Sequence, residues 1–166
     1  CAKDYFDDDL IISYGDIIYS KSILQKLMSS DETFSVVVDL QWEKLWKIRM
    51  DNPIHDVESM IIKNNKIVEL GKKVDDLNQV EGQYIGLIKI KKKFIDEMID
   101  FYYSLDKSKL YCDNSFNNMY MTTFIQLIIN NYNIVSPLYI KAGWLEIDTV
   151  MDLQKYEELN YINNIV

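Results

Sequence analysis

The sequence has little that would mark a secreted, membrane-bound or nucleic-acid-binding protein. Its 166 residues include only two cysteines, Cys1 and Cys112, too few for a disulfide framework or a zinc cluster, which predicts free thiols and a cytoplasmic location. No apolar run approaches the roughly 18 residues that would cross a bilayer, and no signal peptide opens the chain, so no membrane partner is expected. Acidic residues outnumber basic ones to give a net charge of −8, and no basic field exists to attract nucleic acid.

The residues that are present favour a globular fold. Hydrophobic residues make up 48% of the chain and charged residues 27%, a composition typical of one domain with its own core. Repeats and low-complexity segments are absent from the sequence. The chain opens on Cys1 rather than methionine, within a few residues of an apolar strand, so we expect residues 1–166 to be one domain, or part of one, cut from a longer polypeptide.

Apolar patterns predict alternating strands and helices. Residues 10–12 form an apolar run that breaks at Gly15 and Asp16, Ser20 can cap the helix that follows, and residues 33–40 are a second buried strand. This strand, helix, strand order favours a parallel pair joined by a crossover. A short helix with Trp42, Trp46 and Arg49 on one face is expected next, and Asn52 and Pro53 should terminate it. Further elements are expected as a hairpin at 57–70, strands at 83–90, 134–141 and 143–148, helices at 92–105 and 117–130, and a last helix that Thr149 and Asp152 cap as a capping box.

Two aspartates follow apolar strands. Asp16 and Asp148 lie where strands end, and ligands of open α/β sheets bind at the carboxyl ends of strands. A pair of carboxylates can hold one Mg²⁺, whose remaining ligands are substrate phosphates and waters. The alternative is that Asp16 is a turn residue and Asp148 part of a helix start, and spacing alone leaves both interpretations open.

Three stretches carry a resemblance to a known family. "LIISYGDIIYS", "VEGQYIGLIKI" and "GWLEIDTVMDLQKYE", in this order, resemble the nucleotidyltransferases that activate sugar phosphates and choline phosphate, over nearly the whole chain. Asp39, Trp42, Arg49, "HDVES" and "GKK" are more similar to the choline-phosphate and phosphonate cytidylyltransferase branch. The resemblance implies a Rossmann-like α/β fold, with a mixed, mostly parallel sheet and helices on both faces, that is incomplete at the N-terminus. It also implies that residues 1–166 are the C-terminal two-thirds of a catalytic domain.

The activity implied by the resemblance is transfer of a nucleoside monophosphate. The donor would be a nucleoside triphosphate, with CTP favoured, and the acceptor a choline phosphate, phosphonate or sugar phosphate, with release of pyrophosphate. Asp16 and Asp148 match the family's two aspartates that hold catalytic Mg²⁺. Lys72 is the best match to the basic residue on the acceptor phosphate, and Lys73 is the fallback, although a plain surface lysine fits either position. The oligomeric state is left open.

The resemblance also suggests an acceptor pocket. Glu81, Gly82 and Tyr84 fall where the family lines that pocket, and a bend that leads into a strand is the alternative. Trp42 and Arg49 share a helix face with Trp46, where aromatic rings could attract a quaternary ammonium and the arginine a second anion. Tryptophans on one helix face are also typical of a simple core.

Departures from the family leave alternatives open. The glycine-rich, basic loop that grips the triphosphate in these enzymes would precede Cys1, so we expect this chain by itself to be inactive. Thr123 stands where relatives often carry an acidic residue. One alternative is a nucleotide-sugar glycosyltransferase with its metal on residues 7–9, and another is an inactive binding or regulatory module. His55, the only histidine, has no nucleophile to serve and is interpreted as a loop residue.

Overall fold

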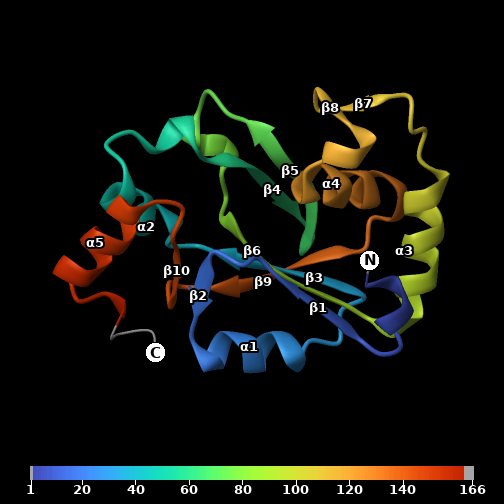
Figure 1. The fold of residues 1–166 in the computed structure, drawn as a ribbon, viewed down its shortest axis with the longest axis horizontal. Coiled ribbons are helices and arrows are strands. Elements are labelled where there is room, and N and C mark those ends of the chain that lie inside the picture. The colour runs from blue at the N-terminus through green and yellow to red at the C-terminus, as the bar shows by residue number, and fades with distance from the viewer. Residues whose placement is uncertain (1, 163–166) are drawn as a thin grey trace.

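The computed structural model describes residues 2–162 as one α/β unit built on a central sheet (Figure 1). Its strands are β1 (Leu10–Ser13), β2 (Ile17–Tyr19), β3 (Phe34–Asp39), β4 (Glu58–Lys63), β5 (Lys66–Lys73), β6 (Gln83–Ile90), β7 (Leu110–Tyr111), β8 (Asn114–Ser115), β9 (Val135–Ile140) and β10 (Trp144–Glu146). Its α-helices are α1 (Lys21–Met28), α2 (Trp42–Arg49), α3 (Lys92–Ser104), α4 (Met121–Tyr132) and α5 (Val150–Glu158), and short 3-10 helices are η1 (Lys3–Tyr5), η2 (Pro53–His55), η3 (Leu77–Gln79) and η4 (Phe116–Asn118). Within the described residues, no helix combines the length and apolar character that crossing a membrane requires.

The central sheet is mixed, with the strand order β1-β6-β3-β9. Strand β6 runs antiparallel to both of its neighbours, and β3 pairs with β9 in parallel. Three of the four strands therefore run in one direction, which confirms the mixed, mostly parallel sheet expected from the sequence. The expected pairing of the first two long strands is wrong, because β6 lies between β1 and β3 and both bond to it.

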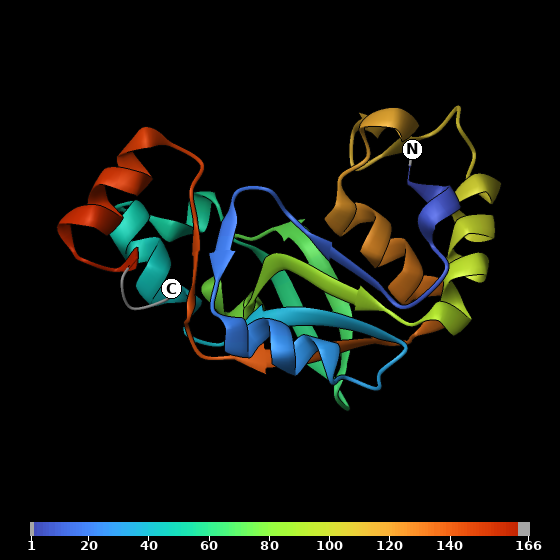
Figure 2. The same cartoon turned by 60° about the horizontal axis from the view of Figure 1, so that its bottom comes forward.

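Each face of this sheet has its own apolar core. Along β3 and β6, Val37 and Leu87 pack with α1, α2 and β10, whereas Val36 and Ile88 pack with α3 and α4. The alternation follows from the pleat, which sends successive side chains to opposite faces. Figures 1 and 2 show α1 on one side of the sheet and α4 on the other, so helices cover both faces.

Local signals in the sequence account for most element boundaries. Asn64 and Asn65 both adopt left-handed backbone at the tip of the β4–β5 hairpin, as this pair of residues favours. Thr149 begins α5 with the predicted capping box. Ser20 precedes α1, but its hydroxyl bonds Ser22 instead of a backbone N–H of the helix, so no side-chain cap forms.

Helix α4 begins later in the chain than the sequence predicts. Helix α4 begins at Met121, because residues 116–118 form the separate turn η4, and it ends where Asn133 turns left-handed. Strand β10 pairs with β2 and lies outside the central sheet. Cys112 carries a free, exposed thiol, and Cys1 lies outside the described residues.

Candidate active site

A polar pocket of about 270 Å³ lies beyond the carboxyl end of β1. It gathers side chains from the β1–β2 turn, α2, the start of β4, the start of β6, α4 and the end of β10. Its lining residues are Tyr14, Trp46, Asp56, Glu58, Gln83, Tyr84, Gly86, Tyr120, Thr122, Glu146 and Asp148. Four of these are carboxylates and none is a lysine, arginine or histidine, so the wall offers negative charge without a basic residue.

Gly86 shapes one side of the pocket. The backbone N–H of Tyr14 donates to the Gly86 carbonyl at 2.9 Å, and the Tyr14 ring occupies the space above this glycine. A Cβ on Gly86 would lie 2.6 Å from the ring, and the residue also has a φ of +79°. This glycine within a strand therefore allows a close approach, and the group that approaches is Tyr14.

Tyr14 and Tyr84 form an aromatic wall. Their ring centroids are 5.6 Å apart with an edge-to-face angle of 84°. Burial raises the pKa of Tyr14, and burial together with Tyr14 raises the pKa of Tyr84 well above the ordinary range, so both hydroxyls stay protonated. The Tyr84 hydroxyl is buried, and within residues 2–162 it neither donates nor accepts a hydrogen bond.

Glu58 and Gln83 place unpaired acceptors in the same wall. Gln83 is 5% exposed, and its Nε2 donates to the Glu58 carbonyl at 3.2 Å. Its Oε1 has no hydrogen-bond partner in the part of the chain that the structure describes. The Glu58 carboxylate takes part in no hydrogen bond or ion pair within residues 2–162. Burial, and secondarily the negative charge of Asp56, raise the pKa of Glu58.

Arg49 neutralises the opposite wall. Its guanidinium, 3% exposed, contacts Glu146 and Asp148 and lies 3.5 Å from Asp152. Burial alone would lower the pKa of Arg49, but the neighbouring carboxylates more than offset this and raise it. Burial also raises the pKa of Glu146, although Arg49 opposes that shift. Lys155 donates to the Arg49 carbonyl at 2.8 Å, so the cluster fastens α2 to β10 and α5.

The two aspartates predicted to hold Mg²⁺ lie on adjacent segments. The backbone N–H of Ile147 donates to the Asp16 carbonyl at 2.9 Å, which places the residue before Asp148 beside the turn that carries Asp16. Asp16 is exposed and its carboxylate has no partner among residues 2–162, whereas Asp148 is paired with Arg49. No three His, Cys, Asp or Glu side chains converge as a metal site within residues 2–162. Two accessible carboxylates nevertheless suit Mg²⁺, which takes its other ligands from phosphates and water.

The lysines of the predicted acceptor site lie outside the pocket lining. Lys72 is 60% exposed and pairs with Glu69, and its backbone N–H donates to the Ser59 hydroxyl at 3.2 Å. Lys73 is exposed and lies opposite Glu58 in the register of β4 and β5. Between the end of the hairpin and the pocket, Gly71 packs directly on Thr122, where a Cβ would come within 2.8 Å.

Glu81 and Gly82 lie outside the pocket lining and contact neighbouring strands. The Glu81 carboxylate accepts the backbone N–H of Ile62 at 3.1 Å, which ties the segment before β6 to β4. Gly82 is buried, and a Cβ there would lie 2.4 Å from Val38. Of the predicted acceptor residues, the structure brings only Tyr84 into the pocket lining.

The two tryptophans of α2 occupy different positions. Trp42 is buried in the core and packs edge-to-face on Trp46, with centroids 6.0 Å apart. Trp46 also reaches the pocket, where its Nε1 donates to the Asp56 carboxylate at 3.0 Å. Arg49 lies over the Trp46 ring at 5.5 Å, so the predicted shared face exists and its cation partner is this arginine.

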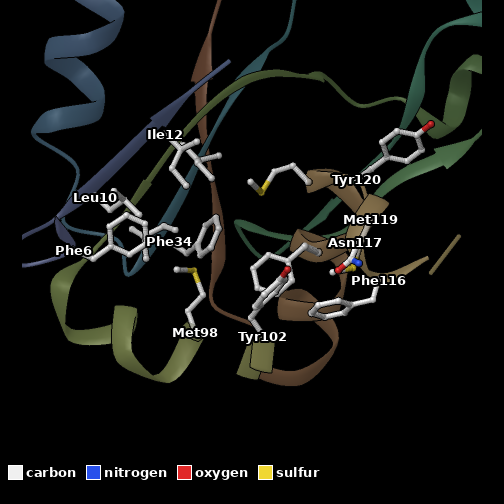
Figure 3. Close-up of a pocket in the computed structure, with 14 residues that line it drawn as sticks. Phe6, Leu10, Ile12, Phe34, Met98, Tyr102, Phe116, Asn117, Met119 and Tyr120 are labelled. Atoms are coloured by element: carbon white, nitrogen blue, oxygen red, sulfur yellow. The ribbon is translucent and has the colours of Figure 1, made fainter. Parts of the chain in front are cut away.

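A second, apolar pocket of about 300 Å³ is lined by other residues of the same strands, Leu10 and Ile12 of β1 and Ile88 and Ile90 of β6 (Figure 3). Its labelled lining residues are Phe6, Leu10, Ile12, Phe34, Met98, Tyr102, Phe116, Asn117, Met119 and Tyr120. Tyr120 lines both pockets and is largely exposed.

The remaining candidates lie elsewhere. Asp9 contacts Lys91 at 3.0 Å and accepts the backbone N–H of Lys92, so the acidic run at 7–9 bonds to lysines at the amino end of β1. Thr123 is buried in α4. The His55 ring faces the Asn52 side chain in the turn η2, which agrees with its interpretation as a loop residue.

Sequence reasoning did not single out several pocket residues. Tyr14, Glu58, Gln83 and Glu146 all lie inside the quoted stretches "LIISYGDIIYS", "HDVES", "VEGQY" and "GWLEID". A polar residue next to a glycine or at a strand end was the available signal. Their convergence depends on the position of β6 between β1 and β3, which no local pattern specifies.

A curated protein resembles this chain over most of its length. A CTP:phosphoglutamine cytidylyltransferase from Campylobacter jejuni is 44% identical over 160 residues, which cover 93% of this chain and 63% of that protein. The resemblance to the nucleotidyltransferases is therefore confirmed. The chain spans 63% of the length of this curated relative, and no family model matches the chain.

Solved nucleotidyltransferase structures share the fold. An inositol-1-phosphate CTP transferase from T. maritima superposes with a TM-score of 0.63 at 21% identity, over 99% of this chain and 63% of that one. A glucose-1-phosphate thymidylyltransferase, described as putative, from Bacillus anthracis gives a TM-score of 0.63 at 16% identity, over 95% of this chain and 57% of that one. At these identities the two likenesses establish the nucleotidyltransferase fold of the chain.

Proposed function

We propose that the protein containing this chain is a cytidylyltransferase that transfers CMP from CTP to a phosphorylated small-molecule acceptor. The observation that carries the proposal is the 44% identity, over 93% of the chain, to an enzyme named for CTP and phosphoglutamine. The location of the polar pocket beside Asp16 and Asp148, at strand ends, supports it. The cytoplasmic location stays a prediction from the cysteine content.

In the proposed reaction, an oxygen of the acceptor phosphate attacks the α-phosphorus of CTP. The new P–O bond forms in line with the bond to the β-phosphate, which breaks, and pyrophosphate leaves with the bonding electrons. Catalysis of this kind depends on positioning and on charge neutralisation. The part played by this chain is to hold the acceptor in the polar pocket, beside the turn that carries Asp16.

Asp16 and Asp148 would hold the Mg²⁺ that the proposal includes. When bound, Mg²⁺ would offset the negative charge that two phosphates bring together. Asp16 is exposed and could act as a ligand. Arg49 would orient Asp148 through an ion pair that leaves the Asp148 side chain 46% exposed. Lys72 is proposed to contact the acceptor phosphate, since its exposed pair with Glu69 costs little to break.

The test is pyrophosphate release by the full-length protein with Mg²⁺. The four ribonucleoside triphosphates are each combined with phosphoglutamine, choline phosphate, aminoethylphosphonate and hexose 1-phosphates. Activity that requires CTP and one acceptor, and that falls by at least about 10²-fold in Asp16→Asn and in Asp148→Asn, is the expected result. Asp8→Asn is the matched control, because it removes a carboxylate from the acidic run and should keep the activity.

Two outcomes would contradict the proposal. Loss of metal binding in Asp8→Asn but not in Asp16→Asn would favour the glycosyltransferase alternative. No pyrophosphate release from a folded full-length protein would favour a binding or regulatory module.

A further inference from the structure

The charge of the polar pocket does not match a purely anionic acceptor. Of its four carboxylates, Glu146 and Asp148 are compensated by Arg49, but Asp56 and Glu58 face no lysine, arginine or histidine in the lining. Among the described residues, the Asp56 carboxylate accepts only the neutral N–H of Trp46. An acceptor that brings phosphate into such a site must carry its own positive charge close to Asp56 and Glu58, because unpaired like charges in a partly buried site repel.

Two hydrogen-bond acceptors at this end of the pocket are unpaired within the described residues. The Oε1 atom of Gln83 belongs to a side chain that is 95% buried and has no partner, and the adjacent Glu58 carboxylate is also unpaired. A buried acceptor without a donor is costly, and native proteins normally satisfy such groups. The Nε2 atom of Gln83 is held by the Glu58 carbonyl, which fixes the carboxamide so that its oxygen remains available.

The shape and the neighbouring rings favour a small alkyl cation. Tyr14 and Tyr84 form an apolar, aromatic wall beside Glu58, where the faces of the rings can attract a cation and the methylene groups next to it. A volume of about 270 Å³ suits a fragment the size of an amino acid. A divalent cation would need more oxygen ligands than Glu58 and Gln83 supply, and within residues 2–162 no third carboxylate completes a metal cluster there.

We propose that Glu58 and the Oε1 atom of Gln83 form a subsite for a primary ammonium group on the phosphorylated acceptor. The N–H donors of the ammonium would satisfy both unpaired oxygens, and its charge would balance Glu58. This inference rests on the proposed function and narrows the acceptor class to aminoalkyl or amino-acid phosphates. A primary amine is required, because a quaternary ammonium has no N–H to donate to Gln83.

The experiment compares isosteric acceptors in the full-length protein. Phosphoethanolamine is matched with n-propyl phosphate, in which CH₃ replaces NH₃⁺, and with choline phosphate, in which the nitrogen is fully methylated. The wild type should prefer phosphoethanolamine over propyl phosphate by about 10-fold or more in kcat/KM, as expected for hydrogen bonds to a charged group. The preference should appear mainly in KM.

Glu58→Gln is the decisive variant. It should reduce the preference for phosphoethanolamine over propyl phosphate to about 3-fold or less, since the variant keeps the size of the side chain and removes its charge. Glu43→Gln is the matched control on an exposed helix position, where Glu43 pairs only with Lys47, and it should behave as the wild type. Equal turnover of all three acceptors by the wild type, or a preference for choline phosphate, would overturn the subsite.

A binding measurement separates this inference from the proposed function. If no acceptor supports pyrophosphate release, the proposed function fails, and calorimetric binding of phosphoethanolamine against propyl phosphate judges the subsite directly. Binding of phosphoethanolamine that is lost in Glu58→Gln supports the subsite. Equal binding of the two compounds, or loss of Mn²⁺ binding in Glu58→Gln without a change in the ammonium preference, overturns it.

Discussion

The two pockets along β1 and β6 have similar volumes, about 300 and about 270 Å³, and opposite chemistry. Leu10 and Ile12 of β1 line the apolar pocket, and Tyr14, directly after the strand, lines the polar one. Strand β6 runs antiparallel to β1, and its Ile88 lines the apolar pocket whereas its Tyr84 lines the polar one. The sheet therefore supplies one continuous surface, and the residues at its ends determine which part can direct a charged ligand.

The difference shows where specificity resides. The apolar pocket offers contact area with few groups that could orient a ligand, whereas the polar pocket holds unpaired acceptors at fixed positions. Apolar burial is non-directional, and hydrogen bonds and charges are not. Substitutions in the apolar pocket should therefore reduce the stability of the protein, and substitutions in the polar pocket should change its ligand preference.

The largest effect is expected for Arg49→Ala, which removes the cation from one wall of the polar pocket. Three carboxylates would lose a guanidinium that is 3% exposed, and the protein should lose about 3–5 kcal/mol in its free energy of unfolding. Urea unfolding measures this. Lys47→Ala on the same helix, where the side chain is 65% exposed, should change stability by less than about 0.5 kcal/mol. Equal effects of the two substitutions would show that the Arg49 cluster does not fasten α2 to β10.

The second effect is expected for Gly86→Ala, between the two pockets on β6. The new Cβ would collide with the Tyr14 ring, and the backbone φ of +79° strains any residue but glycine, so a loss of about 1–3 kcal/mol is expected. Gly15→Ala is the control, because a Cβ there meets nothing within 4 Å. Thermal unfolding of both variants is sufficient, and a Gly86→Ala protein as stable as Gly15→Ala would refute the packing of Tyr14 on this glycine.

A smaller effect is expected for Phe34→Leu in the wall of the apolar pocket. Phe34 is buried on β3, and its shortening should cost about 1 kcal/mol in the free energy of unfolding. The KM for the acceptor should stay at the wild-type value, because Phe34 lines the apolar pocket and does not line the polar one. A raised KM with unchanged stability would indicate that both pockets bind the acceptor.

The sequence predicted the elements better than their arrangement. Local signals such as Asn64 with Asn65 and the capping box at Thr149 specify short-range geometry, and both are present. The insertion of β6 between β1 and β3 pairs residues that are between 44 (Asp39 and Gln83) and 80 (Leu10 and Ile90) positions apart, and no local pattern encodes it. The same long-range pairing brings Gln83 to Glu58, so the composition of the polar pocket could be recognised only in the folded chain.

The smallest effect, of opposite sign, is expected for the stability of Glu58→Gln. Because burial raises the pKa of Glu58 in the folded protein, its ionisation weakens the fold as pH rises from the unfolded value of about 4.3 through the higher folded value. The variant lacks this ionisation and should be more stable than the wild type at pH 8, with the difference vanishing towards pH 4. Glu43→Gln should show no such trend. Melting temperatures of the variant and the wild type between pH 4 and pH 8 test the sign of this difference. If the variant instead loses stability relative to the wild type as the pH rises, a cationic partner already neutralises Glu58. An unpaired, partly buried carboxylate that lowers the stability of the fold is expected at a ligand-binding site, because a bound ammonium would restore the lost free energy.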